Sequence, residues 1–293
     1  MPEIPELQHV AQVLTTRLAG RPLTGVDIQK PIVIRLPRED FEAGLLGVRL
    51  RAVRRSGKFL LFETDRDSVM AINPMLNGRF QWIDGPDGTR KPHARTCFTL
   101  RFEGQAADEA ANDAADDAAD EGADSELGIR YIDERYLGKV YLVDSEDLDQ
   151  VPVLSEQGPD ALDPALDRDA FLKRLKRHRG QVKNTLVNAR FIAGIGNAYS
   201  DEILFQAGIH PFAKISGLDE PRRIRLYESI GETLDWASSL AAEEIGNHID
   251  RKPRDFLRVH RKGGQPCPRC NHPISEVSPN RRVTSFCRHC QPE

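Results

Sequence analysis

Residues 267–290 read CPRCNHPISEVSPNRRVTSFCRHC, which places two Cys-x-x-Cys pairs sixteen residues apart. Two thiolate pairs at this separation match a tetrahedral structural zinc site built on the two knuckles of a β-hairpin. Four thiolates leave no open coordination position, so we predict one zinc ion with a structural rather than a catalytic role. A redox Cys-x-x-Cys pair is the alternative. The predicted ligands are Cys267, Cys270, Cys287 and Cys290.

The net charge of −4 conceals a strong asymmetry along the chain. Residues 105–126 hold nine acidic residues and no base, so the remainder of the chain carries +5. Residues 172–190 contain seven lysines and arginines without an acid, and residues 251–293 carry a net +7 around the predicted zinc site. Two basic blocks are typical of a protein that binds a polyanion, usually nucleic acid. A solvated helix face is an equally good interpretation of residues 172–190 by themselves.

Length and composition exclude a membrane protein. The chain has 293 residues, which at roughly 150 residues per domain suggests about two domains. No run approaches the roughly 18 apolar residues that a spanning helix needs. The N-terminus is acidic where a signal peptide is basic, and it lacks an apolar stretch. We therefore expect a cytoplasmic protein that does not associate with membranes.

The spacing of apolar residues divides the chain into three parts, at 1–150, 151–250 and 251–293. Residues 3–18 have the spacing of an amphipathic helix. Short β-type runs separated by Gly, Pro and Asp then predict an antiparallel sandwich or barrel, with strands at 23–34, 48–55, 58–64, 68–73, 78–82, 96–103, 128–133 and 139–143. In the second part, helices are predicted at 167–179, 181–190, 198–207 and 220–245. The third part is the zinc hairpin, and the fold class is α+β with several domains.

The acidic residues 105–126 fall between two of the predicted strands. An Ala/Asp-rich segment cannot bury enough apolar surface to order itself, so we predict a disordered insert. A short helix is the alternative, because alanine favours helices.

The N-terminal sequence MPEIPEL carries a possible nucleophile. Removal of Met1 would leave Pro2 with a free secondary amine, whose pKa near 8 leaves far more of it uncharged at neutral pH than a lysine. Such an amine can form a Schiff base with a sugar aldehyde carbon, and the neighbouring carboxyls of Glu3 and Glu6 can shuttle protons for it. On these residues alone ordinary helix capping is favoured, because proline and acids are common in the first turn of a helix.

Five segments, in order, resemble the formamidopyrimidine-DNA glycosylase/endonuclease VIII family of base-excision repair enzymes. They are MPEIPEL at 1–7, SGKFLLFE at 56–63, DERYLG at 133–138, FIAGIGNAYSDEILFQAGIHP at 191–211 and the cysteine hairpin. The resemblance covers nearly the whole chain. It implies an N-terminal antiparallel β-sandwich with a leading helix, a helix–two-turns–helix domain, and a C-terminal zinc β-hairpin, with damaged double-stranded DNA bound in the cleft between them.

The resemblance also implies an activity, a DNA glycosylase that excises a damaged base and nicks the strand by β/δ-elimination. Pro2 would be the Schiff-base nucleophile at C1′ and Glu3 the general acid/base. Lys58 and Arg282 would assist proton transfer during strand cleavage. The residues implied at the DNA are Glu6, Leu76, His93, Arg135, Leu137, Lys183 and Asn197, with the last two holding phosphates.

The side chains that fill the gap left by an everted base depart from the family pattern. Leu76 stands where purine-type enzymes place methionine, which makes the chain resemble endonuclease VIII. Arg135 keeps the family arginine that reaches the opposite base, whereas Leu137 replaces the usual phenylalanine wedge. Any apolar wedge can fill a vacated stack. Residues 246–256 are short for the loop that covers 8-oxoguanine in purine-type enzymes.

We therefore expect a monomeric, nucleoid-associated repair enzyme with one zinc ion. Two other classes stay open. One is a non-catalytic relative that binds damaged DNA, and the other is a zinc-ribbon protein with a different partner.

Overall fold

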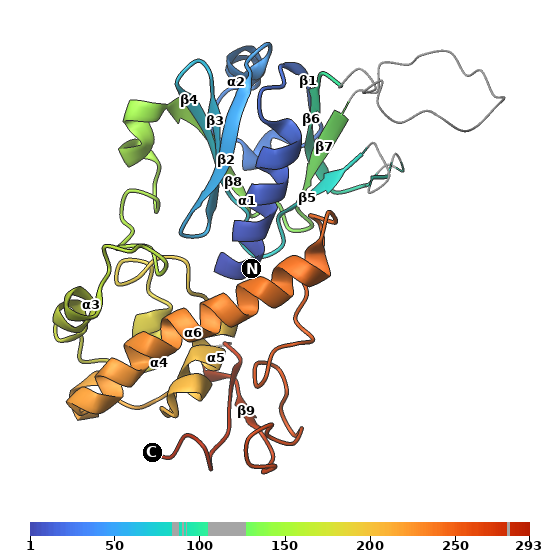
Figure 1. The fold of residues 1–293 in the computed structure, drawn as a ribbon. Helices are drawn as coiled ribbons and strands as arrows, with labels where there is room; N and C mark the ends of the chain where they lie inside the picture. Colours follow the sequence, from blue (N-terminus) through green and yellow to red (C-terminus); the bar gives the residue numbers. More distant parts are fainter. Residues whose placement is uncertain (84–87, 90, 92, 105–126, 280–281) are drawn as a thin grey trace, which may run out of the picture.

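The computed structural model describes residues 1–83, 88–89, 91, 93–104, 127–279 and 282–293. It consists of an N-terminal β-sandwich, a helical domain and a C-terminal hairpin (Figure 1). The chain begins with helix α1 (Ile4–Leu18), as the apolar spacing predicted. Its buried side packs on strand β2 of the sandwich and on helix α6 of the helical domain. The first helix therefore contacts both large domains.

The sandwich contains two four-stranded antiparallel sheets. Each predicted β-type run overlaps one of the eight strands that the described residues form in the sandwich. The first sheet has the order β1 (Leu23–Ile28), β6 (Thr96–Phe102), β7 (Leu127–Ile132) and β5 (Arg79–Trp82). The second has the order β2 (Leu50–Ser56), β3 (Phe59–Thr64), β4 (Ser68–Asn73) and β8 (Lys139–Asp144). The prediction of an antiparallel sandwich is confirmed.

Two details of the sandwich differ from the prediction. The first strand ends at Ile28 rather than residue 34, and the 3₁₀ helix η1 (Pro31–Val33) follows it. Proline has no N–H to donate to a strand ladder, so it ends the strand pattern. Helix α2 (Arg38–Leu45) was not predicted, because its eight residues bury only Phe41 and Leu45 and give little periodicity.

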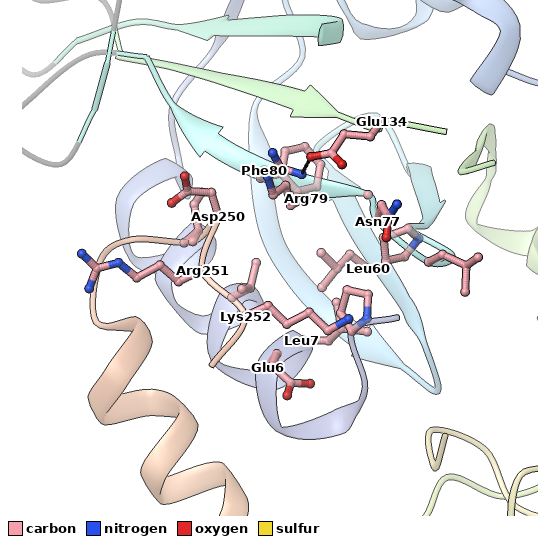
Figure 2. Close-up of a pocket in the computed structure, with 16 residues that line it drawn as sticks. Glu6, Leu7, Leu60, Asn77, Arg79, Phe80, Glu134, Asp250, Arg251 and Lys252 are labelled. Carbon is pink, nitrogen blue, oxygen red and sulfur yellow. Dashed lines mark hydrogen bonds and ion pairs between the residues drawn. The ribbon is translucent and has the colours of Figure 1, made fainter. Parts of the chain in front are cut away.

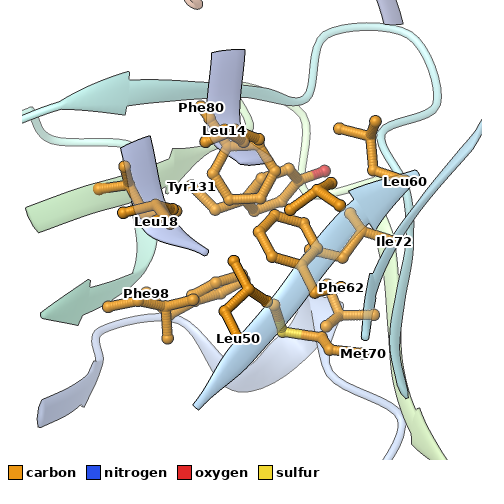
Figure 3. Packing of buried hydrophobic residues seen from close by; sticks show 14 of the residues in the cluster. Leu14, Leu18, Leu50, Leu60, Phe62, Met70, Ile72, Phe80, Phe98 and Tyr131 are labelled. Atoms are coloured by element: carbon orange, nitrogen blue, oxygen red, sulfur yellow. The ribbon is translucent and has the colours of Figure 1, made fainter. Parts of the chain in front are cut away.

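The core of the sandwich lies between its two sheets (Figure 3). Leu14 of α1 packs there among Phe62 and Phe80, and the ring of Tyr131 stacks on Phe98 with centroids 5.3 Å apart. Burial of such side chains stabilises each by about 1.5–3 kcal/mol. The helix and both sheets thus share one core.

The helical domain contains α3 (Arg168–Leu175), α4 (Val182–Leu186), α5 (Asn197–Ala207) and α6 (Glu220–Ile245). Two short 3₁₀ helices, η2 (Ser145–Gln150) and η3 (Ile215–Gly217), lie on the connections. Helix α4 is half the predicted length, because the Asn188 side chain accepts the N–H of Arg190 and forms a turn in its place. Such local hydrogen bonds of asparagine compete with helix formation.

The N-terminal helix and the helical domain interlock. Ile4, the first residue of α1, is fully buried in the core of the helical domain. At the far end of α6, the indole N–H of Trp82 donates to the Asn247 carbonyl at 2.9 Å, and His9 Nε2 lies 2.7 Å from the Gly246 carbonyl. The ends of α1 and α6 therefore fix how the domains meet.

The C-terminal hairpin consists of β9 (Ser275–Val277) and β10 (Thr284–Phe286). It packs on the helical domain through a small core that includes Phe205, Val259 and Ile274. A buried polar network adds to this contact, since Asp201 of α5 accepts from the Ser285 backbone N–H at 3.1 Å and pairs with His260 at 2.8 Å. The predicted acidic insert at 105–126 lies outside the described residues. None of the helices in the described ranges is long and apolar enough to cross a membrane.

Candidate active site

The chain's amino group lies in a desolvated, positively charged setting. Burial, together with the hydrogen bond and charge of Lys252, lowers the pKa of the Met1 amine to about 4, although Glu3 acts to raise it. Arg254 adds to the positive potential and donates to the Met1 carbonyl at 3.3 Å. Removal of Met1 would leave the amine on Pro2, which lines the same cavity as Lys252. An amine with a lowered pKa is unprotonated, and hence nucleophilic, at neutral pH.

Glu3 is buried and binds the start of helix α5. Its carboxylate accepts backbone N–H groups from Gly196 at 2.7 Å, Ala198 at 3.1 Å and Tyr199 at 3.3 Å. Burial acts to raise the pKa of Glu3, but the charges of Arg254 and Lys58 and the amide hydrogen bonds outweigh burial and hold the pKa below its usual value. Glu3 is therefore ionised at neutral pH, in a position where a helix N-terminus favours an anion.

Gly196 is required by this contact. A Cβ at that position would lie 2.5 Å from the carboxyl carbon of Glu3. Because residue 196 is a glycine, the start of α5 can approach the Glu3 carboxylate closely.

Glu6 has a pKa shifted in the opposite direction from that of Glu3. Its carboxylate accepts the hydroxyl of Tyr199 at 2.8 Å and the backbone N–H of Glu3 at 2.9 Å, and it pairs with Arg254 at 3.0 Å. Burial raises the pKa of Glu6 in spite of these partners, and the charge of Glu3 adds to the increase. Neighbouring carboxyls with pKa values pushed apart are typical of acid–base sites.

Lys58 lies in the β2–β3 turn and is influenced by the charge of Glu3. Desolvation lowers its pKa, the charge of Glu3 acts to raise it, and the charge of Arg282 lowers it further. Lys58 therefore lies within electrostatic reach of both the Glu3 carboxylate and Arg282 of the zinc hairpin. The structure thus brings these charges together, although 279 residues separate Glu3, the residue after Pro2, from Arg282.

The turn that carries Lys58 is clamped by Asp160. The carboxylate of Asp160 accepts both terminal nitrogens of Arg55 at 2.5 and 2.8 Å and the backbone N–H of Gly57 at 2.9 Å. The Arg55 side chain is only 5% exposed. Gly57 has a φ of +55°, and a Cβ there would lie 1.8 Å from the Gln157 side-chain oxygen. The connection between the two domains thus fixes the position of the lysine.

The predicted phosphate-binding residues differ in how available they are. Asn197 begins α5, and its amide N–H donates to the Val283 carbonyl at 2.8 Å. The ammonium group of Lys183 is buried and donates to Asp201 at 2.6 Å, Thr284 at 2.8 Å and the Val283 carbonyl at 3.0 Å. In this arrangement Lys183 holds strand β10 in place. Its contact with a phosphate stays a prediction and requires a change of partner.

The predicted gap-filling residues lie exposed on neighbouring turns. Leu76 follows β4 and is 38% exposed, whereas Arg135 and Leu137 precede β8 and are also exposed, Leu137 by 41%. The residues before the two leucines, Met75 and Tyr136, have φ values of +49° and +55°. His93 is half-buried, and its Nδ1 accepts the Arg95 backbone N–H at 3.2 Å.

A cavity of about 240 Å³ opens between the N-terminus and these turns (Figure 2). Its lining includes Pro2, Leu76, Phe80 and the backbone connection that follows α6. In Figure 2 the Lys252 side chain extends across this cavity from that connection, toward Leu7 and Leu60. A cavity of this size beside the amine could hold a small planar group.

The four C-terminal cysteines are positioned to bind a metal ion. Their sulfur atoms all lie within 4.8 Å of one another, with Cys270 and Cys287 at 3.4 Å and Cys267 and Cys290 at 3.8 Å. A tetrahedral zinc with Zn–S bonds of about 2.3 Å requires S–S separations of about 3.8 Å. The geometry matches the predicted zinc site. The four thiolates occupy every coordination position, so zinc would stabilise the hairpin without a reactive ligand.

Sequence reasoning missed several residues of the site. Arg254 and Lys252 belonged to a basic block, but nothing in the pattern pointed them toward the N-terminus. Tyr199 and Asp160 contact Glu6 and Arg55 across separations of 193 and 105 residues, which no local spacing reveals.

Three family models together match most of this chain. Residues 1–140 match the formamidopyrimidine-DNA glycosylase N-terminal domain, residues 157–248 its H2TH domain, and residues 264–292 a zinc finger found in FPG and IleRS. A formamidopyrimidine-DNA glycosylase of Lactobacillus delbrueckii subsp. bulgaricus is 31% identical, over 99% of both chains. The chain belongs to the formamidopyrimidine-DNA glycosylase family. The predicted family, the DNA glycosylase class of enzyme and the zinc finger are thereby confirmed.

Other members of the formamidopyrimidine-DNA glycosylase family agree with this assignment. The relative from Moorella thermoacetica is 30% identical over 94% of both chains. Among solved structures, the Lactococcus lactis enzyme in complex with N7-benzyl-Fapy-dG DNA superposes with a TM-score of 0.83, at 25% identity and with complete coverage of both chains. The predicted combination of β-sandwich, H2TH domain and zinc hairpin is therefore the family fold.

Proposed function

We propose that the chain excises an oxidised or ring-opened base from double-stranded DNA through an imine on the Pro2 nitrogen, and then cleaves the strand. The observation that carries this proposal is the position of Glu3 at the start of α5, within electrostatic reach of both the N-terminal amine and Lys58. The Lactococcus lactis relative was solved with Fapy-dG DNA and with abasic-site DNA. In the abasic site C1′ is free to react with an amine, whereas in Fapy-dG C1′ carries the base that the amine would displace.

The proposed reaction begins at C1′ of the damaged nucleotide. The unprotonated Pro2 nitrogen forms a bond to C1′ as the bond to the base breaks, and the departing base takes up a proton. The ionised carboxylate of Glu3 stabilises positive charge on the sugar and accepts the proton that the amine loses. Three backbone N–H groups donate to the Glu3 carboxylate and keep it ionised.

Strand cleavage follows from the imine. The imine forms when the C1′–O4′ bond breaks and O4′ takes up a proton. Loss of a C2′ proton then breaks the C3′–O bond and expels the 3′ phosphate, and loss of a C4′ proton breaks the C5′–O bond and expels the 5′ phosphate. Lys58, whose pKa is lowered by desolvation, can exchange protons near neutral pH better than an ordinary lysine. Arg282 brings a permanent positive charge to the phosphates that leave. Zinc has no step in this sequence and holds the hairpin that presents Arg282.

The substrate is proposed to enter as an everted nucleotide. Extrusion of a base costs a few kcal/mol, least for a damaged one. Leu76, Arg135 and Leu137 would then occupy the gap, and the cavity beside Pro2 would receive the base. One chain supplies both sides of this site, which supports a monomer acting on chromosomal DNA.

Borohydride trapping on a panel of single-lesion duplexes tests the proposal. The panel contains a formamidopyrimidine, an oxidised pyrimidine, an abasic site and an undamaged duplex. We expect a covalent protein–DNA complex with the abasic site and with at least one base lesion, and none with undamaged DNA. A protein that binds every lesion duplex without any trapped product would be a non-catalytic relative instead.

A further inference from the structure

The turns that carry the proposed gap-filling residues both cross from one sheet of the sandwich to the other. We call residues 74–78 the Leu76 turn, which joins β4 to β5, and residues 133–138 the Arg135 turn, which joins β7 to β8. Because the turns come from separate parts of the chain, their spacing depends on what lies between them. The structure places one buried side chain there.

Each turn is ordered internally by hydrogen bonds. In the Leu76 turn, Gly78 donates to the Pro74 carbonyl at 2.8 Å. In the Arg135 turn, the two carboxylate oxygens of Asp133 accept the backbone N–H groups of Arg135 at 3.0 Å and Gly138 at 2.6 Å. Asp133 is completely buried. Each turn is therefore a well-defined unit, and only their mutual position is left to fix.

The side chain between the turns is Tyr131. It is fully buried, with its ring against Phe98 at 5.3 Å and Phe80 at 5.4 Å, and Figure 3 shows its hydroxyl at the edge of the core. A Cβ on Gly78 would lie 2.1 Å from this hydroxyl oxygen, and a Cβ on Gly138 would lie 2.2 Å from it. The same oxygen thus touches the backbone of both turns at their glycines.

The Tyr131 hydroxyl has no hydrogen-bond partner among the described residues. A buried hydroxyl without a partner costs free energy, so packing rather than hydrogen bonding accounts for its position. A surface ion pair, Arg79 to Glu134 at 3.0 Å, also bridges the turns. Its side chains are 29% and 52% exposed, and such pairs hold a geometry weakly. The buried Tyr131 side chain is therefore a more rigid contact between the turns than the Arg79–Glu134 ion pair.

We infer that Tyr131 is a positioning residue that fixes the Leu76 turn relative to the Arg135 turn, so that their side chains enter the DNA as one wedge. The inference rests on the proposed function and deepens it. An everted nucleotide leaves a gap of about 3.4 Å per strand step, and side chains from two turns fill it together only if their spacing is constant. Close packing in the interior transmits such a constraint between segments.

Tyr131→Phe tests the inference with the smallest change, because it keeps the ring and removes only the hydroxyl. We expect excision of a damaged base from duplex DNA to slow about tenfold, within the range found for coupled residues. Borohydride trapping on a preformed abasic site, which needs no base departure, should stay within about twofold of wild type. Tyr141→Phe on β8 is the matched control, and it should leave both rates unchanged.

A suppression experiment separates positioning from general damage to the fold. Gly138→Ala should impair excision, because the new methyl meets the hydroxyl at 2.2 Å. Adding Tyr131→Phe should restore much of the rate, since the closest remaining contacts of that methyl would be 3.1 Å. The same addition should not rescue Gly78→Ala, whose methyl also meets the Pro74 carbonyl oxygen at 2.6 Å.

A double-mutant cycle with Leu76→Ala completes the test. If Tyr131 acts by positioning the Leu76 turn, then Tyr131→Phe should cost little more in a Leu76→Ala background. Unchanged excision by Tyr131→Phe, or losses that multiply in the double variant, would overturn the inference. Failure of the wild-type protein to trap abasic DNA would instead overturn the proposed function, so the two failures are distinguishable.

Discussion

Burial and the charges of Lys252 and Arg254 lower the pKa of the Met1 amino group to about 4. An ordinary pKa near 8 made the amine a possible nucleophile, and the family resemblance favoured that role over helix capping. The structure adds that burial and neighbouring cations lower the pKa of the Met1 amine, and we expect them to act on a Pro2 amine in the same direction.

The first prediction concerns the identity of the nucleophile. An uncleaved N-terminal tag, or retention of Met1, should abolish borohydride trapping on abasic DNA while DNA affinity stays nearly unchanged. Peptide mapping of the wild-type adduct should locate it at Pro2. If a blocked protein traps normally and Lys58→Ala does not, lysine is the nucleophile and the assignment is wrong.

The second prediction concerns Glu3→Gln. The amide still fits between the backbone N–H groups of α5, but it carries no charge and cannot accept a proton. We expect base excision to fall by about 10²–10⁴-fold, the usual contribution of a general acid–base group. Cleavage of a preformed abasic site should fall much less. Single-turnover kinetics on the two substrates measure the difference, and equal losses would contradict a role in base departure.

The third prediction concerns pH and Lys252→Met. A lowered amine pKa keeps the nucleophile unprotonated as the pH falls, so wild-type trapping should stay near its plateau down to about pH 6, well below the usual amine pKa. Loss of the Lys252 charge and hydrogen bond should raise the amine pKa, so trapping should slow below about pH 8 and recover above it. The exposed Lys30→Met is the charge-matched control. A pH profile that Lys252→Met leaves unshifted would contradict this role.

The interaction of Glu3 with α5 shows what the sequence could and could not predict at this scale. The chemistry of MPEIPEL identified the amine and its neighbouring carboxyls. The partners of these groups lie at residues 196–199 and 254, and only the packing of Ile4 into the helical domain brings them together. Residue types were therefore predictable, whereas pKa shifts, which depend on distant partners, were not.

At the scale of elements, Asp160 in the connection between the two large domains binds Arg55 and Gly57 and so holds the β2–β3 turn. The strands were predictable because alternating apolar residues and turn residues act over a few positions. Helix α4 was predicted too long, since the Asn188 turn leaves the apolar spacing unchanged. The Asp160 clamp had no local signal, because its partners are 103 and 105 residues away.

The fourth prediction is that Asp160→Asn weakens this clamp. The amide keeps the shape of the side chain but leaves the buried Arg55 without a charged partner. Loss of a hydrogen bond to a charged group should lower the free energy of unfolding by about 1.5–3 kcal/mol, measured by urea denaturation. Abasic-strand cleavage should also slow, because Lys58 moves with the turn. Asp163→Asn, an exposed neighbour, should change neither quantity.

At the scale of the whole molecule, buried charged side chains attach the zinc hairpin to the helical domain, in addition to the apolar packing between them. Lys183 and Asp201 bind strand β10, and Arg282, two residues before this strand, lies within electrostatic reach of Lys58. The cysteine spacing predicted the metal. It did not predict that the hairpin's position depends on an ion pair in the helical domain.

The fifth prediction follows from this dependence. Cys267→Ser should lose zinc, measured by metal analysis, and should weaken binding to lesion DNA because Arg282 loses its support. Retention of one zinc per chain would contradict the ligand assignment. Cys97→Ser, at a cysteine outside the cluster, should keep the metal.

The hydrogen bonds between Glu3 and the start of α5 join segments that the ribosome makes far apart in time. At roughly 5–20 residues per second, residue 197 is synthesised about 10–40 s after the N-terminus. During that interval the amine has neither the carboxylate's helix partner nor the cations that follow α6, so it keeps an ordinary pKa near 8 and is mostly protonated. A growing or prematurely terminated chain thus carries the amine mainly in its protonated form, which is not nucleophilic. We therefore expect strand cleavage to require the folded chain, in which the start of α5 and residues 252–254 lie beside the N-terminus.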